Sequence, residues 1–271
     1  MLTIQELLRF TAEAGASDLH VSSGSFPMVR VHGRMKKLNL PKLSHEDVSQ
    51  LLDGVLTDVQ KELFKEKLEI DFSTKLSNDV RFRVNAFNQI NGYAASFRVI
   101  PNEIKSYSEL HLPEILERLS MKEKGLILVT GPTGSGKSTT LATIIDSINE
   151  KTQKHIITVE DPIEFVHQSK NSLVNQRELG HDTWSFTAAL RSALREDPDV
   201  ILVGEMRDLE TVSLALTAAE TGHLVLATLH TSSATKTIDR IIDMYPREQQ
   251  AQVRSMLSES LEAVIAQTLC P

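Results

Sequence analysis

The chain has 271 residues, of which 41% are hydrophobic and 24% charged, as in ordinary globular proteins. Its formal net charge of −7 argues against a nucleic-acid partner and gives no attraction to anionic lipid. A single cysteine, Cys270, excludes an internal disulfide and a zinc site built from cysteines, and no apolar run is long enough to cross a membrane. We therefore predict a cytoplasmic protein without direct membrane insertion.

The first 99 residues mix helix and strand patterns and predict a small α+β domain. Helices are expected where apolar residues recur at helical spacing, at residues 4–14, 44–55 and 58–67. The second of these helices begins with the capping-box pair Ser44 and Asp47. Short strands are expected at residues 18–21 and 28–32.

A predicted β-hairpin places three arginines on one side of this domain. Residues 80–86 alternate between apolar and polar side chains, and Asn91-Gly92 is a strong hairpin turn signal. A turn at that pair places Asn85 opposite Arg98. One face is then apolar, and the other, the arginine face, carries Arg81, Arg83 and Arg98. This face is either a solvated polar surface or a cluster that binds a phosphate on another domain or subunit.

Residues 100–111 contain Pro101 and no periodic pattern, and we interpret them as a linker to a second domain, residues 112–271. In that domain an apolar strand at 126–129 precedes the sequence Gly-Pro-Thr-Gly-Ser-Gly-Lys-Ser at 131–138, and an amphipathic helix follows. Strand, loop and helix in this order are the context that a phosphate-binding loop requires. The alternative, a Gly/Ser-rich turn, explains neither the lysine nor the terminal hydroxyl.

This loop predicts ATP and Mg²⁺ as ligands. Its glycines let backbone N–H groups approach phosphate oxygens, and the following helix presents its positive end to the same anion. Lys137 is expected to reach the β- and γ-phosphates, and Ser138 to bind Mg²⁺. The residues expected to contact the nucleotide are Gly131, Pro132, Thr133, Gly134, Ser135, Gly136, Lys137, Ser138 and Thr139.

Carboxylates follow two further predicted strands. The strand at 155–159 is followed by Glu160 and Glu164. Because ligands of open α/β sheets bind beyond the carboxyl ends of the strands, either glutamate is a candidate to position the attacking water. The alternative is a surface acidic turn. The strand at 200–203 is followed by Glu205, which matches the Walker B carboxylate that holds Mg²⁺ through water.

Two histidines flank the predicted strand at 224–229. We expect His230 to sense the γ-phosphate or to position water, and His223 to act at the nucleotide as well. The alternative for both is a structural role. Earlier in the chain, Arg191 and Arg195 lie near the C-terminal end of a predicted helix. They are either cations that suit the negative end of the helix dipole or ligands of the nucleotide. A final helix is expected over residues 248–267.

The sequence resembles a known superfamily at several places. Residues 190–231 are similar to the signature of the secretion and type IV pilus ATPases. The segments that resemble one branch of that superfamily, the retraction ATPases of type IV pili, are ASDLHVSSG, RVHG and RFRVNAFNQINGYAASFRVIP. The similarity extends over nearly the whole chain. It therefore predicts membership of that branch.

The resemblance implies an α/β fold with a RecA-like P-loop NTPase core, preceded by a smaller α+β PAS-like N-terminal domain. It implies a homohexameric motor that hydrolyses ATP and powers pilus retraction, and thus twitching motility, by pilin disassembly. The implied partner is the inner-membrane platform protein of the pilus machine, which places the motor at the cytoplasmic base of the pilus.

The resemblance also implies roles for individual residues. Glu164 matches the general base of the family's aspartate box, which also contains Glu160, and Glu205 matches its Walker B carboxylate. The histidine box contains His223 and His230. The arginines that engage the nucleotide across the domain interface, either within one subunit or between two, correspond to Arg81, Arg83 and Arg98.

Two departures from the family pattern bear on the function. Pilus assembly and type II secretion ATPases carry a tetracysteine zinc insert, and one cysteine cannot supply it, which favours the retraction branch. The family pattern continues past Pro271, so the second domain is expected to be incomplete at its C-terminus. The alternatives are an assembly or secretion ATPase and a nucleotide-binding regulatory subunit with little turnover. The net charge and the few aromatic residues oppose a nucleic-acid motor.

Overall fold

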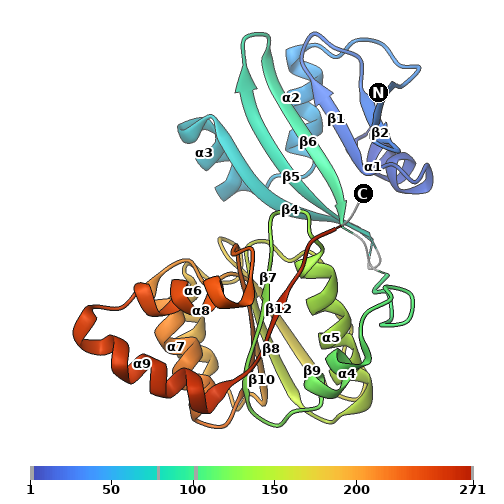
Figure 1. Ribbon diagram of the computed structural model, residues 1–271. Helices are drawn as coiled ribbons and strands as arrows, with labels where there is room; N and C mark the ends of the chain where they lie inside the picture. Colours follow the sequence, from blue (N-terminus) through green and yellow to red (C-terminus); the bar gives the residue numbers. More distant parts are fainter. Residues whose placement is uncertain (1–2, 78–79, 101–102, 270–271) are drawn as a thin grey trace. The chain divides into compact units, whose positions relative to one another are not determined.

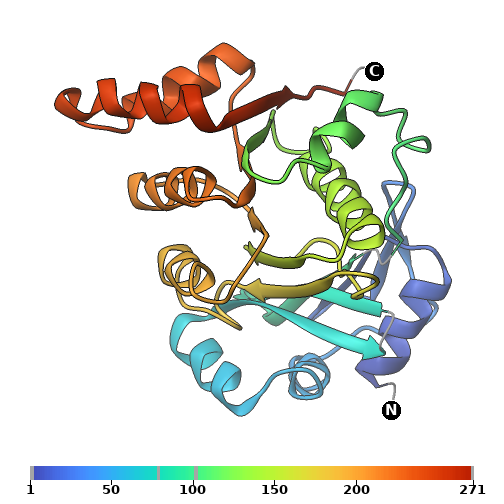
Figure 2. The ribbon, with the colours of Figure 1, turned by 90° about the horizontal axis from the view of Figure 1, so that it is seen from below.

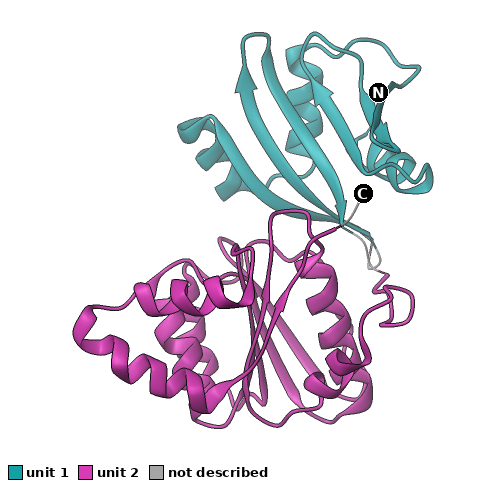
Figure 3. Ribbon diagram, viewed as in Figure 1, with its two compact units in different colours: residues 1–102 teal, residues 103–271 magenta. Residues whose placement is uncertain are grey.

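The computed structural model describes residues 3–77, 80–100 and 103–269. Cys270 lies outside these residues, as does Pro101 of the predicted linker. The chain forms two compact units, unit 1 at residues 1–102 and unit 2 at residues 103–271 (Figure 3). No helix in the described ranges has the length and apolar character needed to cross a membrane.

Unit 1 is built on a six-stranded antiparallel sheet with the strand order β3-β2-β1-β6-β5-β4 (Figure 1). The strands are β1 (Asp18–Ser22), β2 (Met28–Val31), β3 (Arg34–Lys37), β4 (Glu69–Ser77), β5 (Val80–Gln89) and β6 (Gly92–Ile100). The helices are α1 (Ile4–Glu13), α2 (His45–Asp53) and α3 (Asp58–Lys67). Each helix begins with a capping box, and the predicted pair Ser44 and Asp47 is confirmed.

The three helices of unit 1 pack on one face of its sheet. Alternate residues of the central strands, such as Phe82, Val84 and Phe97, are fully buried against Leu8 of α1 and Val48 of α2. Burial on the pleated surface selects alternate side chains, so the intervening residues lie on the other face. The arginine face is therefore the side of the sheet that these helices do not cover.

The pairing register of β5 and β6 differs from the prediction by two residues, because Asn85 pairs with Ser96 and not with Arg98, and the turn begins one residue earlier. The turn is formed by Ile90 and Asn91, and Gly92 already pairs with Gln89. A β-carbon on Gly92 would overlap the imidazole of His45 at the start of α2. This glycine therefore serves a close approach to a helix and not the turn itself. Because the shift is an even number of residues, each side chain keeps its predicted face.

Unit 2 contains a six-stranded sheet with the order β12-β7-β11-β10-β8-β9, in which all neighbours are parallel. The strands are β7 (Gly125–Thr130), β8 (His155–Glu160), β9 (Leu173–Glu178), β10 (Val200–Val203), β11 (Leu224–Leu229) and β12 (Leu261–Ala266). The helices are α4 (Glu114–Ser120), α5 (Lys137–Lys151), α6 (Phe186–Ala193), α7 (Leu209–Glu220), α8 (Ala234–Asp243) and α9 (Arg247–Ser260).

Helices cover both faces of this parallel sheet (Figure 1 and Figure 2). Helix α5 packs with residues such as Ile144 and Ile148 against one face, and α6 to α9 pack against the other. Strands covered on both sides are apolar throughout, and every residue of β7 and β11 is buried. The carboxyl ends of the parallel strands meet at one edge of the sheet, where ligands of such folds bind.

Two predictions for the ends of unit 2 are changed by the structure. Residues 103–111 belong to unit 2, because Tyr107 packs on its core and the backbone carbonyl of Lys105 accepts a hydrogen bond from Thr143 of α5. The predicted helix 248–267 is wrong after Ser260, since residues 261–266 form β12 and pair with β7. Apolar residues at 257, 261, 264 and 265 fit a helix and a strand alike, and pairing with the sheet decides between them.

Candidate active site

The predicted phosphate loop, residues 131–136, connects the end of β7 to the start of α5 (Figure 1). Gly131, Gly134 and Gly136 all have positive φ, a conformation in which other residues are strained. Gly136 is the N-cap of α5, and no described side chain accepts a hydrogen bond from the first turn of this helix. The free N–H groups and the positive end of the 15-residue helix α5 form a site suited to phosphate.

Lys137 is held at the base of this loop. Its side chain is nearly buried, and its Nζ donates hydrogen bonds to the carbonyl oxygens of Gly131 (2.9 Å) and Pro132 (3.1 Å). Burial lowers the pKa of the ammonium group, while the negative charges of Glu205 and Glu164 act in the opposite direction. The charges of both predicted carboxylates thus act on Lys137.

Glu160 and Glu164 lie in different surroundings at the end of β8. The Glu160 carboxylate accepts hydrogen bonds from Thr158 Oγ1 (2.7 Å) and Gln176 Nε2 (3.1 Å). Burial raises its pKa to about 7, against the effect of these two hydrogen bonds. Glu164 is exposed, and its carboxylate makes no hydrogen bond or ion pair to any described residue. Glu164 is therefore the glutamate that is free to bind water.

Glu205 follows β10 and lies between an arginine and a histidine. Its carboxylate contacts Arg207 Nη2 at 2.7 Å and His230 Nε2 at 3.1 Å, and its side chain is 20% exposed. Burial alone raises the pKa of Glu205, but the hydrogen bond from Arg207 and the charges of His230 and Arg207 lower it overall. The carboxylate is thus kept ionised, as an Mg²⁺ ligand must be.

Arg207 is a member of this cluster that the sequence analysis did not single out. Besides Glu205 it contacts Asp161 at 3.8 Å, which links the residues after β8 and β10. The sequence did indicate a role for Arg207, because it stands two residues after the Walker B glutamate. A charged residue at that position lies at the carboxyl ends of the strands, where ligands bind.

The residues fit a magnesium ion bound together with phosphate. Ser138 lies in the first turn of α5, and Glu205 supplies an ionised carboxylate at the same sheet edge. Magnesium is commonly held by one or two protein groups together with substrate phosphates and water. Accordingly, the fit does not require a full protein cage, and the described residues contain no group of three His, Cys, Asp or Glu side chains that could form one.

His230 and His223 lie at opposite ends of β11. His230 follows the carboxyl end and contacts Glu205, in line with its predicted place. His223 precedes the amino end, where its carbonyl accepts from Gly125 N and its ring contacts the carbonyl of Ala218 at 2.9 Å. The expectation that His223 lies at the nucleotide is therefore wrong for the phosphate loop of its own unit. Parallel strands place their two ends at opposite edges of the sheet, and only one edge carries the loop.

Arg191 lies on α6 and Arg195 lies just after it. Both arginines make contacts within unit 2. Arg191 forms an ion pair with Glu210 of α7, and Arg195 Nη1 donates to the carbonyl of Arg191 at 2.7 Å. These contacts favour the interpretation as cations near a helix end.

In unit 1, the arginine face is confirmed and one of its members has a buried partner. Arg83 and Arg98 lie directly opposite each other on β5 and β6. Arg98 Nε donates to Asp18 at 2.8 Å, and the Asp18 side chain is only 4% exposed while that of Arg98 is 69% exposed. Burial tends to raise the pKa of Asp18, but the hydrogen bonds from Arg98 and Ser17 lower it overall. An ionised Asp18 thus holds an arginine that is itself largely exposed.

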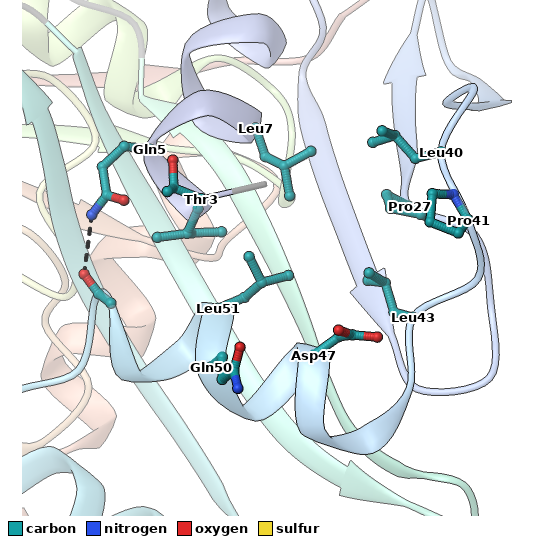
Figure 4. Close-up of a pocket in the computed structure, with 12 residues that line it drawn as sticks. Thr3, Gln5, Leu7, Pro27, Leu40, Pro41, Leu43, Asp47, Gln50 and Leu51 are labelled. Carbon is teal, nitrogen blue, oxygen red and sulfur yellow. Dashed lines mark hydrogen bonds between the residues drawn. The ribbon is translucent and has the colours of Figure 1, made fainter. Parts of the chain in front are cut away.

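Unit 1 also contains a pocket of about 450 Å³ between α1, α2 and the segment before α2 (Figure 4). Its lining is mainly apolar, with Leu7, Leu40 and Leu51 among the residues that face it. Gln5 Nε2 donates a hydrogen bond to the carbonyl oxygen of Gly54 at 3.2 Å. Asp47 is the only titratable side chain among the described residues that line this pocket. The candidate active site therefore remains at the carboxyl ends of the strands of unit 2.

Comparison with known proteins gives consistent results. A protein-family model described as "Type II/IV secretion system protein" matches residues 2–271. The chain is 59% identical over 268 residues to the Pseudomonas aeruginosa protein named type IV pilus retraction ATPase PilT, covering 99% of this chain and 78% of that protein. It is 60% identical over 243 residues to a Neisseria gonorrhoeae twitching motility protein, covering 90% of this chain and 65% of that protein.

A solved structure is similar over the whole chain. The crystal structure of the pilus retraction motor PilT with bound ADP superposes with a TM-score of 0.96 at 51% sequence identity. The match covers 100% of this chain and 79% of the solved one. The chain thus spans between 65% and 79% of the length of these relatives.

Proposed function

The chain belongs to the type II/IV secretion system protein family, and on this basis we propose that it is an ATPase that powers retraction of type IV pili. The observation that supports this most strongly is that Lys137, at the end of the phosphate loop, feels the charges of both Glu205 and Glu164, in a chain 59% identical to a pilus retraction ATPase. A loop that binds phosphate needs no such carboxylates, whereas hydrolysis requires a group that orients water and a group that holds the metal.

The residues of unit 2 divide the chemistry among them. Backbone N–H groups of the loop and of the first turn of α5 bind the β- and γ-phosphates, and the charge of Lys137 stabilises the negative charge on the transferred group. Glu164 orients a water molecule toward the γ-phosphorus. His230 Nε2 lies 3.1 Å from the Glu205 carboxylate, and from this place His230 senses the γ-phosphate or positions water.

A magnesium ion held by Ser138 and Glu205 would neutralise phosphate charge when bound. Glu205 would act on the ion partly through water, from its place between Arg207 and His230. Arg207 also contacts Asp161.

We propose further that unit 2 is a RecA-like core, that unit 1 is a PAS-like domain, and that the protein works as a homohexamer at the inner-membrane base of the pilus. The platform protein of the pilus machine is then its partner. The solved relative is named a pilus retraction motor, and a motor requires parts that move during the ATP cycle. The arginine face supplies a candidate for the moving contact with nucleotide.

Removal of Arg83 or Arg98 is expected to lower kcat at least tenfold. An arginine that stabilises transition-state charge contributes strongly to phosphoryl transfer, and tenfold is a lower bound on such effects, about 10³–10⁵ in known cases. The thermal stability of the nucleotide-free protein should change little for Arg83→Ala, because exposed charges contribute about 0–1 kcal/mol to folding. Steady-state ATPase rates and thermal melts measure the two effects. Arg34→Ala is the matched control. Arg34 is an exposed arginine of β3, and its register partner Val31 places it on the helix-covered face of the sheet, opposite to the arginine face.

Mixing of variants identifies the route by which an arginine acts. If the arginine reaches the loop of a neighbouring subunit, Lys137→Ala chains should restore activity to Arg98→Ala chains, because some interfaces then pair an intact loop with an intact arginine. If it acts within one subunit, every chain in the mixture lacks one essential group and activity stays low. Full activity of Arg83→Ala and Arg98→Ala alone would reduce this face to a solvated surface.

The proposed function is tested most directly in a strain that lacks its own retraction ATPase. The protein should hydrolyse ATP with Mg²⁺ in vitro and restore twitching motility, whereas the Lys137→Ala variant should do neither. Restored pilus assembly in a strain without its assembly ATPase would favour the assembly alternative. ATP binding with no turnover would favour a regulatory subunit, and hydrolysis stimulated by DNA would favour a nucleic-acid motor.

A further inference from the structure

The edge strand β12 ends against the phosphate loop. Gln267, the residue after this strand, donates its backbone N–H to the carbonyl of Thr130 at 2.8 Å. Thr130 is the last residue of β7, and the loop begins one residue later. A β-carbon on Gly131 would overlap the carbonyl oxygen of Gln267, so only glycine allows this approach. The backbone of Gln267 therefore fixes the entrance of the loop.

The side chain of the same residue reaches the far end of the loop. Gln267 Nε2 is 2.8 Å from Thr140 Oγ1. Thr140 lies on α5 one turn after Lys137, is 2% exposed, and donates its N–H to the carbonyl of Gly136. The other amide atom of Gln267, Oε1, is buried and has no hydrogen-bond partner among the described residues. The bond to Thr140 is thus the polar contact that holds this side chain.

We propose that Gln267 is a positioning residue for the phosphate loop, which it holds at both ends. The six loop residues between these ends must present their N–H groups in one direction to bind phosphate, and each alternative arrangement reduces affinity. Gln267 directly follows the edge strand β12 and forms no hydrogen bond to a catalytic side chain among the described residues. Its effect is therefore on nucleotide binding through the loop. The inference rests on the proposed function only in that the loop binds a nucleotide.

The test is the affinity for ADP of variants that remove this one bond. Gln267→Met keeps the length of the side chain and removes its polar end, and Thr140→Val removes the partner. Titration calorimetry should show ADP binding about three- to tenfold weaker for each, in line with the loss of one hydrogen bond. The double variant should bind no more weakly than either single variant, because both remove the same contact. KM for ATP should rise in parallel, while kcat stays within about twofold because Lys137 and Glu164 are intact.

Two further variants separate positioning from general loosening of the fold. Thr140→Ser keeps the hydroxyl and should bind ADP as the parent does. Gln250→Met is the matched control, because Gln250 is a half-buried glutamine of α9 whose Nε2 donates to the carbonyl of Tyr245 at 3.1 Å. It should leave ADP affinity unchanged even if it lowers the melting temperature.

The outcomes distinguish this inference from the proposed function. A parent protein that binds no ADP contradicts the proposed function. A parent that binds ADP, together with Gln267→Met and Thr140→Val variants that bind equally well, overturns the role of Gln267. Equal weakening by Gln267→Met and Gln250→Met overturns it as well. If Gln267→Met does not fold, the comparison of Thr140→Val with Thr140→Ser decides the question.

Discussion

Replacement of Lys137 by alanine is expected to lower the rate of ATP hydrolysis by about 10²–10³-fold, equivalent to about 2.7–4 kcal/mol of transition-state stabilisation. Nζ is held by two backbone carbonyls at the start of the loop and is only slightly exposed, so its charge acts in a partly dehydrated place. A charge in such surroundings interacts more strongly with phosphate oxygens than an exposed one. Turnover measured over a range of ATP concentrations gives the effect.

A second lysine serves as the control for this variant. Lys154 precedes β8, at the edge of the sheet opposite to the loop, and its Nζ also donates to a backbone carbonyl, that of Lys122 at 3.2 Å. Lys154→Ala should therefore hydrolyse ATP at the parental rate. The lysine assignment fails if Lys137→Ala retains a rate within about threefold of the parent while its fold is intact.

The residues around Lys137 were predictable because their signals are local. A phosphate loop needs its glycines, lysine and hydroxyl at fixed spacing in one short segment, between an apolar strand and an amphipathic helix. Glu205 and Glu164 follow buried strands, and parallel strands bring their carboxyl ends to one edge whatever the order of the strands. The sequence pattern thus predicted the group around Lys137 without knowledge of the sheet order.

Features that depend on tertiary contacts were predicted less well. His223 and His230 both flank β11, and only the position of the loop relative to that strand separates their roles. The strand β12 follows a helix without a break in the apolar pattern, and its pairing with β7 is a long-range event. Gln267 had no signal at all, since its function is to contact two residues more than a hundred positions earlier in the chain.

The pairing of Asp18 with Arg98 is another contact of this kind. The arginine face followed from alternation along the strands, whereas the buried carboxylate beneath Arg98 comes from a strand eighty residues away. A charged residue in a strand pattern usually indicates an exposed position. Asp18 is an exception, because its charge is compensated by Arg98 and more weakly by Arg30 at 3.7 Å.

The second large effect is expected at Glu164. Glu164→Gln should lower kcat by about 10²–10⁴-fold, the usual contribution of a group that takes up or directs a proton. Its affinity for ATP should stay close to that of the parent, because a carboxylate that acts on the attacking water contributes little to binding in the ground state. Single-turnover hydrolysis and equilibrium titration with ATP measure the two quantities separately.

The matched variant is Glu160→Gln in the same acidic segment. Thr158 and Gln176 already hold the Glu160 carboxylate, so an amide there should keep part of this network and change kcat only a few-fold. Glu205→Gln provides a second contrast. Because Glu205 acts through the metal, that variant should need more Mg²⁺ to reach its maximal rate, and the Mg²⁺ dependence of Glu164→Gln should be unchanged.

The pH profile of the parent enzyme also distinguishes the two glutamates. Burial raises the pKa of Glu160 to about 7, so this carboxyl group loses its charge as the pH falls through neutrality. If Glu160 were the base, kcat would fall about tenfold per pH unit below about pH 7 and reach a plateau above it. If Glu164 orients the water, kcat should not follow that titration, and Glu160→Gln should leave the profile unchanged. If instead Glu160→Gln hydrolyses ATP slowly and Glu164→Gln does so at the normal rate, Glu160 is the base.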